Sequence, residues 1–382
     1  SYKNISVDNG LPSNIIFDIK QDNFGYLWIA TNKGLVKFDG DDFTQINKLK
    51  TNNLFVKENT VFAGLENGLF IKKKSKELFI KNKKVTKVFS YRNTIFVGSY
   101  EGIFYLKNDE LFPIKINTTI DFSIINDIIF CNNSFYIATN NGLFIISNLL
   151  KPQKINKINN DNIVSLISFN DKIIAATSFN KILVINGKTI INTIETLDNI
   201  STVKKLKNEI WVTSKTNGIE VFVLPSFSFK QKINKYNSLN TNTIHNVFKD
   251  NYNTTYMASD KGIYVMNADN FDNKNNTKPK IFFENLLINH QNVDSLLTVK
   301  KVRLSHLENN ISISYKTVDL INPNKIEYRY KLKNNFSPWS SNNTIQFPNL
   351  STGKYVFQVQ SRIKNHESKL KSFSFIDKTN LN

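Results

Sequence analysis

A repeated unit of roughly 38 residues is the feature that most constrains the fold of this chain. The segment NIIFDIKQDNFGYLWIATNKGL (14–35) aligns without a gap to NTIHNVFKDNYNTTYMASDKGI (242–263), and further copies lie between them. Seven units align on one column that is glycine in all but one unit and takes six of the chain's 13 glycines. The column contains Gly34, Gly68, Gly102, Gly142, Lys181, Gly218 and Gly262. The sequence therefore predicts seven copies of one structural module.

Each unit has the pattern of a small antiparallel sheet. An alternating apolar run is followed by a short polar turn and by a second strand that ends with a bulky residue, one intervening residue and a small residue. The bulky column is Trp28, Phe62, Phe96, Tyr136, Ile174, Trp211 and Tyr256. The small column is Ala30, Gly64, Gly98, Ala138, Ala176, Thr213 and Ala258. The glycine column then falls in a tight turn, where glycine adopts a positive φ without a Cβ clash.

Sheets of this size are not stable alone, but repeated around an axis they bury their faces against one another. We therefore expect an all-β chain whose residues 1–278 form a seven-bladed β-propeller. The N-terminal segment Tyr2–Ser6 aligns with Lys230–Asn234, within the predicted outer strand of the sixth unit, whereas the seventh unit lacks a clear fourth strand of its own. We expect this segment to complete the seventh blade and close the ring.

A second domain is expected over residues 279–382. The repeat stops at the polar stretch NKNNTKPK, which contains Pro279 and is typical of a domain boundary. Short strand-like runs follow, such as KIFFENLLIN, KIEYRYKLK and GKYVFQVQSRI. This pattern predicts an immunoglobulin/fibronectin-III-like β-sandwich, with Trp339 and the aromatic strand residues in its core.

The net charge of +19 raises the question of a nucleic-acid partner. Only four of the 50 basic residues are arginine, the residue preferred for forked contacts with phosphates and bases. We therefore expect no nucleic-acid partner, and we interpret the lysines as solvated residues that discourage edge-to-edge strand pairing. The single cysteine, Cys131, is expected to be a small buried apolar residue.

Motifs for catalysis, metal binding or cofactor binding are not found in the sequence. The four histidines lack metal-ligand spacing, and there is no glycine-rich phosphate loop or nucleophile elbow. The acidic stretch DGDDF (39–43), together with Asp22 and Asp250, is interpreted as turn residues. We expect no metal, no cofactor and no enzymatic activity. A polysaccharide-cleaving enzyme stays open as an alternative, because catalytic carboxylates need not be adjacent in sequence.

Candidate ligand-binding residues lie in the turns between the second and third strand of each unit, which are expected on one face around the axis. Two of these turns carry an aromatic residue, Tyr100 or Phe179, whose ring could stack on a sugar. Polar side chains that could bond to sugar hydroxyls are Lys33, Glu101, Asn141 and Lys261. The alternative is that all six are ordinary exposed turn residues.

Two segments resemble known families. The segment NGLPSNIIFDIKQDNFGYLWIATNKGLVKFDGDDF resembles the two-component-regulator propeller repeat, and YRYKLKNNFSPWSSNNTIQFPNLSTGKYVFQV resembles the triple-tyrosine (Y_Y_Y) domain that follows such propellers. The matching tyrosines are Tyr328, Tyr330 and Tyr355, with Trp339 and Gly353 in the expected order. Our own interpretation of these tyrosines is structural.

This order of domains resembles the sensor half of membrane signalling proteins of the Bacteroidota. The resemblance implies a place in the periplasm or on the extracellular face of the inner membrane, with a membrane helix and a histidine kinase or regulator output following. It also implies a homodimer in the full-length protein and, by analogy, a glycan or other small extracellular ligand. Many family members carry two propellers, whereas this chain has one. A propeller that only docks other proteins is the main alternative.

Overall fold

The computed structural model describes residues 2–116, 124–151, 155–266 and 278–377. These residues are mostly β-strands, with three short 3-10 turns, η1 (Val7–Asn9), η2 (Asp294–Thr298) and η3 (Pro323–Lys325). Within these ranges no helix is long and apolar enough to cross a membrane. Contacts divide the chain into two compact units, one containing most of residues 1–273, the other containing residues 274–382 and two short loops, 23–26 and 39–42.

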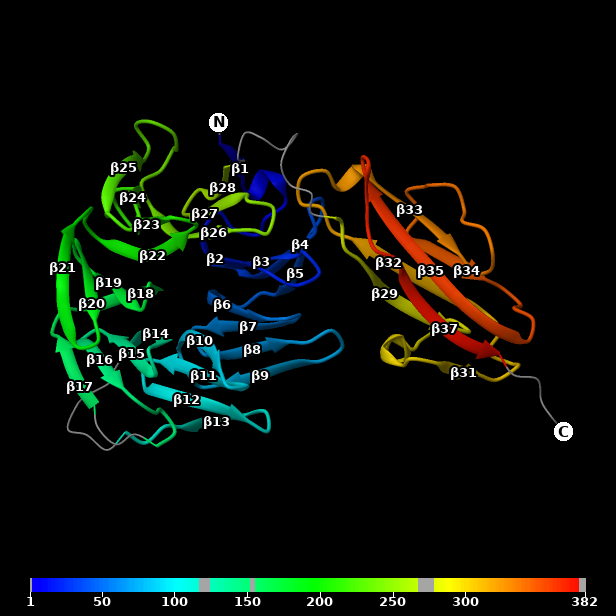
Figure 1. The fold of residues 1–382 in the computed structure, drawn as a ribbon, viewed down its shortest axis with the longest axis horizontal. Helices are drawn as coiled ribbons and strands as arrows, with labels where there is room; N and C mark the ends of the chain where they lie inside the picture. The colour runs from blue at the N-terminus through cyan, green and yellow to red at the C-terminus, as the bar shows by residue number, and fades with distance from the viewer. Residues whose placement is uncertain (1, 117–123, 152–154, 267–277, 378–382) are drawn as a thin grey trace. The chain divides into compact units, whose positions relative to one another are not determined.

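The first unit consists of seven four-stranded antiparallel sheets, the blades of a propeller (Figure 1). Blades 1 to 3 are β2 (Ile16–Gln21), β3 (Leu27–Thr31), β4 (Gly34–Phe38), β5 (Phe43–Asn47); β6 (Thr51–Lys57), β7 (Thr60–Leu65), β8 (Gly68–Lys72), β9 (Glu77–Lys81); and β10 (Val85–Tyr91), β11 (Thr94–Ser99), β12 (Gly102–Lys107), β13 (Glu110–Pro113). Blades 4 and 5 are β14 (Ile125–Cys131), β15 (Ser134–Thr139), β16 (Gly142–Ile146), β17 (Ile155–Asn159); and β18 (Ile163–Phe169), β19 (Lys172–Thr177), β20 (Lys181–Asn186), β21 (Thr189–Glu195). Blades 6 and 7 are β22 (Ile200–Leu206), β23 (Glu209–Ser214), β24 (Ile219–Val223), β25 (Ser228–Ile233); and β26 (Ile244–Lys249), β27 (Thr255–Ser259), β28 (Gly262–Met266), β1 (Lys3–Ile5).

The blades form a closed ring. The first strand of each blade contacts the first strand of the next, and β26 of blade 7 contacts β2 of blade 1. The outer strand of blade 7 is β1, which pairs antiparallel with β28 so that Ile5 lies opposite Ile263. The predicted seven-bladed β-propeller is confirmed.

The small column has a structural cause in the register of each blade. In every blade a bulge near the start of the first strand places one polar residue opposite the small residue of the second strand. We call these seven polar residues the axial ring: Asp18, Asn53, Lys87, Asp127, Ser165, Thr202 and Asn246. A Cβ added at Gly64 would lie 2.4 Å from the side-chain nitrogen of Asn53. The small residues therefore leave room for the polar side chains near the axis.

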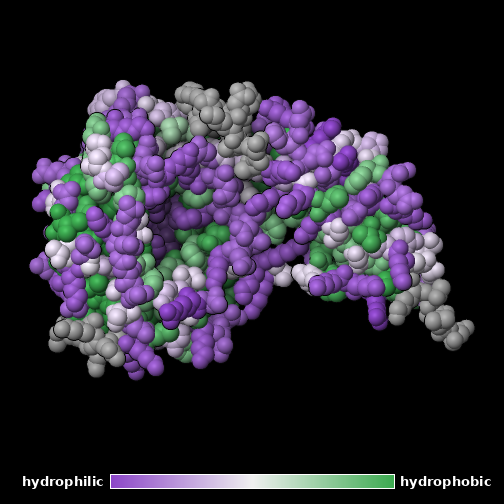
Figure 2. Space-filling model, in the orientation of Figure 1, coloured by the Kyte–Doolittle hydropathy of each residue, from purple (hydrophilic) through white to green (hydrophobic). Residues whose placement is uncertain are grey.

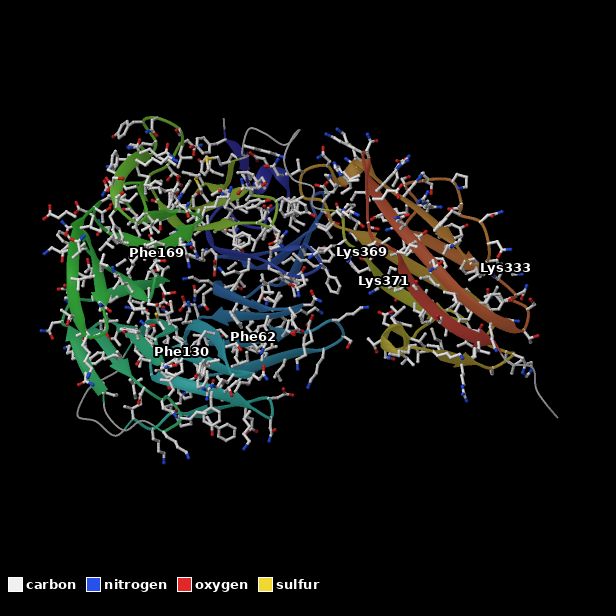
Figure 3. The ribbon with its side chains drawn as sticks, in the orientation of Figure 1. Phe62, Phe130, Phe169, Lys333, Lys369 and Lys371 are labelled. Atoms are coloured by element: carbon white, nitrogen blue, oxygen red, sulfur yellow. The ribbon has the colours of Figure 1, made fainter. Side chains whose placement is uncertain are left out.

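The bulky column lies in the core between neighbouring blades. Trp28 and Trp211 are only 4% and 3% exposed. The labelled side chains Phe62, Phe130 and Phe169 come from strands of blades 2, 4 and 5 (Figure 3). Cys131 is partly buried against the core of blades 4 and 5, and burial raises the pKa of its thiol.

The second unit contains two sheets that enclose one apolar core. The first sheet has the order β30 (Gln291–Asn292), β29 (Ile281–Ile288), β32 (Ile311–Thr317) and β34 (Thr344–Phe347). The second has the order β31 (Val302–Leu304), β37 (Lys371–Asp377), β35 (Gly353–Ile363) and β33 (Ile326–Lys331), with β36 (His366–Glu367) paired to β35. Side chains of both sheets share the core, for example Tyr315 and Phe357. This is the predicted β-sandwich.

Trp339 does not lie in that core, and this expectation was wrong. The residue follows Pro338 in the loop between β33 and β34 and is partly exposed. The guanidinium groups of Arg329 and Arg362 lie 4.4 and 4.5 Å from the centroid of its ring. An indole that stacks on two cations gains favourable contact while the cations stay solvated, so the surface position is physically reasonable.

The three tyrosines of the Y_Y_Y pattern stabilise the second unit. The buried hydroxyl of Tyr328 accepts a hydrogen bond of 3.1 Å from the backbone nitrogen of Thr317. Tyr355 donates to the carbonyl oxygen of Ser351 at 2.6 Å. The Tyr330 ring stacks on Phe357. Their contacts are those of structural residues, as the sequence predicted.

Candidate functional site

A polar pocket at the axis of the propeller is the best candidate for a functional site. Its volume is about 310 Å³, and the first strands of all seven blades line it. The seven residues of the axial ring are among its lining residues. Figure 2 shows a recess in the middle of the propeller that is bordered mainly by hydrophilic residues. Because every blade contributes the same position of its first strand, the repeat itself brings these polar groups together.

Asp18 links three blades at this pocket. Its Oδ2 accepts a hydrogen bond of 2.9 Å from the backbone nitrogen of Leu54 in blade 2. Its Oδ1 accepts from Asn246 Nδ2 in blade 7 at 2.8 Å, from Lys20 Nζ at 2.9 Å and from the backbone nitrogen of Ile19. Such bonds compensate for the loss of water around a buried carboxylate.

Asp127 has the equivalent arrangement in blade 4. Its Oδ2 accepts from the backbone nitrogen of Leu166 in blade 5 at 2.8 Å, and its Oδ1 accepts from the backbone nitrogen of Ile128. Lys87 of blade 3 forms an ion pair with Asp127 at 2.7 Å. Burial disfavours the charged form of Lys87, but the nearby Asp127 carboxylate more than offsets this and raises the lysine pKa.

Lys204 of blade 6 lies in the same pocket without such a partner. Among the described residues, no carboxylate lies within ion-pair distance of its ammonium group. Burial, together with the charges of Lys20 and Lys87, lowers its pKa to about 8, against the opposing effect of Asp18 and Asp127. The pocket thus holds one cation that the protein does not neutralise.

One end of the pocket opens where the second and third strands of the blades are joined. Lys215, in the turn between β23 and β24, is exposed and lines the pocket, as does His245. Burial lowers the pKa of His245, so its imidazole is mostly neutral at pH 7.

A short chain of contacts leads outward from the pocket. Phe17 lies under the ammonium of Lys50, Lys50 and Lys84 both pair with Glu66, and Lys84 lies 4.4 Å from the Tyr100 ring centroid.

The six turn residues singled out from the sequence are exposed, and none of them lines the axial pocket. Tyr100 and Phe179, at 43% and 63% exposure, belong to blades 3 and 5. Glu101 pairs with Lys83. The backbone nitrogens of Lys33, Asn141 and Lys261 each bond to the hydroxyl of the Thr or Ser two residues before. Of the six, Tyr100 has a described contact path to the pocket, and a role for all six in binding stays a prediction.

The axial residues were missed by the sequence reasoning, although a signal was present. They face the small column across the first hairpin of each unit, so aligning the first strands on that column would have revealed seven polar residues. No single unit shows the pocket, because each contributes only two to four of its lining residues.

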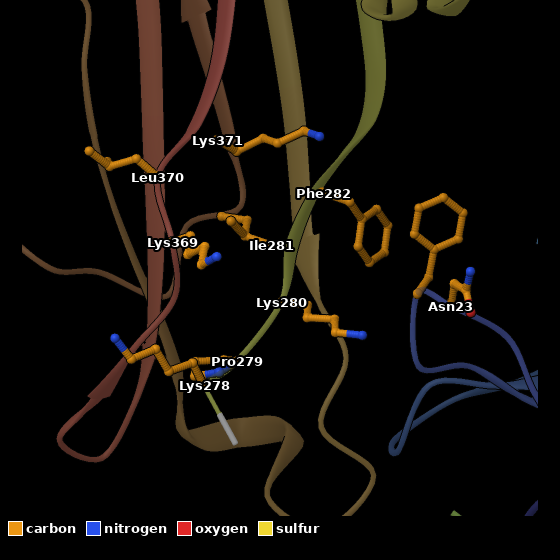
Figure 4. Close-up of a pocket in the computed structure, with 10 residues that line it drawn as sticks. Asn23, Lys278, Pro279, Lys280, Ile281, Phe282, Lys369, Leu370 and Lys371 are labelled. Carbon is orange, nitrogen blue, oxygen red and sulfur yellow. The ribbon is translucent and has the colours of Figure 1, made fainter. Parts of the chain in front are cut away.

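The described residues contain other candidate sites, but these are less suited to binding a ligand. They contain no cluster of three or more histidine, cysteine, aspartate or glutamate residues suited to a metal ion. The second unit has a pocket of about 460 Å³ whose lining includes four lysines, Lys278, Lys280, Lys369 and Lys371 (Figure 4). All four are exposed, so water already solvates their charges.

Two family models match parts of the chain. A family model described as "Two component regulator propeller" matches residues 10–33, and one described as "Y_Y_Y domain" matches residues 319–376. The chain therefore contains a propeller repeat of the first kind and a domain of the second. No curated protein matches the chain.

Three solved structures share the fold. The extracellular domain of BT3049 from B. thetaiotaomicron, described as a hybrid two component system, is 19% identical with a TM-score of 0.60, and the match covers 98% of this chain and 57% of that one. The corresponding domain of BT4673 from the same organism is 15% identical with a TM-score of 0.61, covering 99% and 59%. PorZ of Porphyromonas gingivalis, a component of the type-IX secretion system, is 11% identical with a TM-score of 0.56, covering 96% and 60%. The chain thus spans less than two thirds of the length of each.

Proposed function

We propose that this chain is the extracytoplasmic ligand-sensing part of a bacterial two-component signalling protein, and that its propeller binds the ligand at the axial pocket. The order of a regulator propeller and a Y_Y_Y domain supports the signalling role, as does the shared fold with extracellular domains described as parts of such systems. The observation that carries the site is a polar pocket to which all seven blades contribute.

The contacts of the two pocket carboxylates favour binding over catalysis. Both oxygens of Asp18 and both oxygens of Asp127 accept hydrogen bonds from backbone nitrogens, and each carboxylate also pairs with a lysine. Glycoside cleavage needs one carboxylic acid that can give up a proton and a second that is free to act on the sugar or on water. Carboxylates held in this way serve as fixed acceptors, so we infer that this fragment is not an enzyme.

The ligand that fits this proposal is an oligosaccharide or another small extracellular molecule. Its terminal unit would enter the axial pocket, and the rest would lie across the turns that carry Tyr100 and Phe179, where rings can stack on sugar faces. Lys33, Glu101, Asn141 and Lys261 would supply hydrogen bonds on that surface. In the full-length protein, the sandwich would relay the change to a membrane helix and a kinase or regulator output, within a homodimer.

Calorimetry of the 382-residue chain against a panel of neutral and acidic oligosaccharides tests the binding role. We expect at least one to bind, with an affinity that falls at least fivefold in Tyr100→Ala or Phe179→Ala. The matched control is Phe229→Ala, because Phe229 is an exposed aromatic residue of the outer strand β25. Full affinity in both turn variants would remove those turns from the site.

A transcriptional reporter driven by the full-length protein tests the signalling role. We expect the bound sugar to change reporter output. A protein that captures a protein partner but ignores every sugar would support the docking alternative, and release of shortened glycans by the purified chain would support the enzyme alternative.

A further inference from the structure

We propose that the axial pocket takes a small anion, best matched by the carboxylate of an acidic sugar unit, and that Lys204 is the cation that binds it. This inference deepens the proposed function and rests on it. It follows from the charges, the neutral polar side chains and the volume of the pocket.

The charges that face the pocket do not balance. Two of the three lysines on the first strands are paired, Lys20 with Asp18 and Lys87 with Asp127, and Lys204 is left over. The β6 and β18 strands contribute no charged residue to the lining. The complete set of charged and titratable lining residues is Asp18, Lys20, Lys87, Asp127, Lys204, Lys215 and His245. Three ammonium groups therefore face two carboxylates on the pocket walls, and the exposed Lys215 adds a further positive charge at the mouth.

An unpaired ammonium group on the wall of a narrow pocket is unfavourable, because protein replaces part of its water. The lowered pKa of Lys204 reports this cost. A ligand carboxylate would supply the missing partner, and a charge-assisted hydrogen bond is about twice as strong as a neutral one. Lys50 and Lys84 share one carboxylate, Glu66, so the surface around Tyr100 also carries excess positive charge that would attract an anion.

The neutral polar side chains of the lining favour a ligand that also carries hydroxyl groups. They include Asn52, Thr86 and Asn126. A sugar ring has more hydroxyl groups that can bond to such side chains than a simple inorganic anion has.

The size of the pocket restricts the ligand further. A volume of about 310 Å³ lies at the lower end of the range of ~300–1,000 Å³ that is typical of small-molecule sites. It suits one terminal sugar unit. The lysine-rich pocket of the second unit is larger, but its four lysines are exposed and need no ligand to compensate for lost water.

Calorimetry with galacturonate and galactose tests the inference, because these sugars differ only in whether C6 is a carboxylate. We expect galacturonate to bind at least tenfold more tightly than galactose, and Lys204→Met to abolish this preference. The matched control is Lys205→Met, since Lys205 is the next residue, is exposed and does not line the pocket. Raising the pH from 7 to 9.5 should weaken galacturonate binding roughly tenfold or more, because Lys204 loses its proton.

Inorganic phosphate is the third ligand and separates a sugar acid from a simple anion. Phosphate binding as tight as that of galacturonate would overturn the sugar component, and equal binding of galacturonate and galactose would overturn the anion component. Unchanged galacturonate binding in Lys204→Met, or no binding of any of the three, would overturn the whole inference. A neutral oligosaccharide that drives the reporter would leave the proposed function standing while this inference fails.

Discussion

Asn246 of blade 7 donates a hydrogen bond of 2.8 Å to Asp18 of blade 1. The two residues occupy the same position of their repeats, since each faces the small residue of its own second strand, Ala258 or Ala30. The bond joins the last unit of the repeat to the first. It closes the inner side of the ring, while β1 completes the outer side.

Removing the Asp18 carboxylate should destabilise the propeller. In Asp18→Ala the backbone nitrogen of Leu54 and the amide of Asn246 lose their acceptor, and Lys20 loses its partner. We expect the free energy of unfolding to fall by about 2–4 kcal/mol. The control is Asp161→Ala at an exposed position, which should change it by less than about 0.5 kcal/mol. Chemical denaturation measures both, and equal effects would contradict the linking role.

Gly262→Ala should loosen the closing strand. Gly262 has a φ of +98°, and an added Cβ would lie 2.2 Å from the carbonyl oxygen of Ile5 in β1. Gly102 also has a positive φ, of +113°, but nothing lies within 4 Å of an added Cβ. The comparison with Gly102→Ala therefore isolates the clash from the backbone strain. We expect Gly102→Ala to cost about 1 kcal/mol of unfolding free energy and Gly262→Ala at least about 2 kcal/mol more.

Deleting residues 1–8 should lower the melting temperature of the propeller sharply. The deletion removes β1 and leaves the outer edge of β28 unpaired. Differential scanning calorimetry checks this. An unchanged melting temperature would mean that β1 adds little to the stability of the ring.

Tyr328→Phe should weaken the second unit, because the backbone nitrogen of Thr317 then loses its acceptor inside the core. We expect a loss of about 1–3 kcal/mol in unfolding free energy. Tyr330→Phe is the matched control on the same strand, since the partly buried Tyr330 stacks on Phe357 through its ring. If both variants lose the same stability, the hydroxyl of Tyr328 is not the important group.

Lys204→Met should stabilise the unliganded propeller at pH 7 by about 1–3 kcal/mol, since an apolar side chain removes the cost of the unpaired charge. The sign of the pH dependence follows from the lowered pKa. Below about pH 8, Lys204 is protonated in the folded and unfolded states, so the full cost is present. Between about 8 and the ordinary value of 10.5, the folded state has lost the proton and the unfolded state keeps it, so the cost fades. Thermal melts at pH 7 and 9.5 should show the advantage of Lys204→Met shrinking, and a constant advantage would contradict this.

The blades could be predicted because every unit repeats the same local physics. The glycine column marks a turn, and the bulky column marks a core. Seven such sheets can bury both of their faces when they are arranged in a ring. The axial pocket could not be located from local signals, because its charges are spread over units 34 to 44 residues apart and only ring closure brings Asp18 beside Asn246. Trp339 was misplaced because aromatic residues usually mark a core, whereas here the ring packs against two arginines and stays partly exposed.

The pairing of β1 with β28 also has a consequence for biosynthesis. The ribosome synthesises β1 long before β28. β1 therefore has no pairing partner until six complete blades have been synthesised. Contacts between distant parts of a chain form slowly, and an unpaired strand edge can capture a neighbouring molecule in the meantime. The nascent protein therefore has an unpaired closing strand until residues near Gly262 have been synthesised.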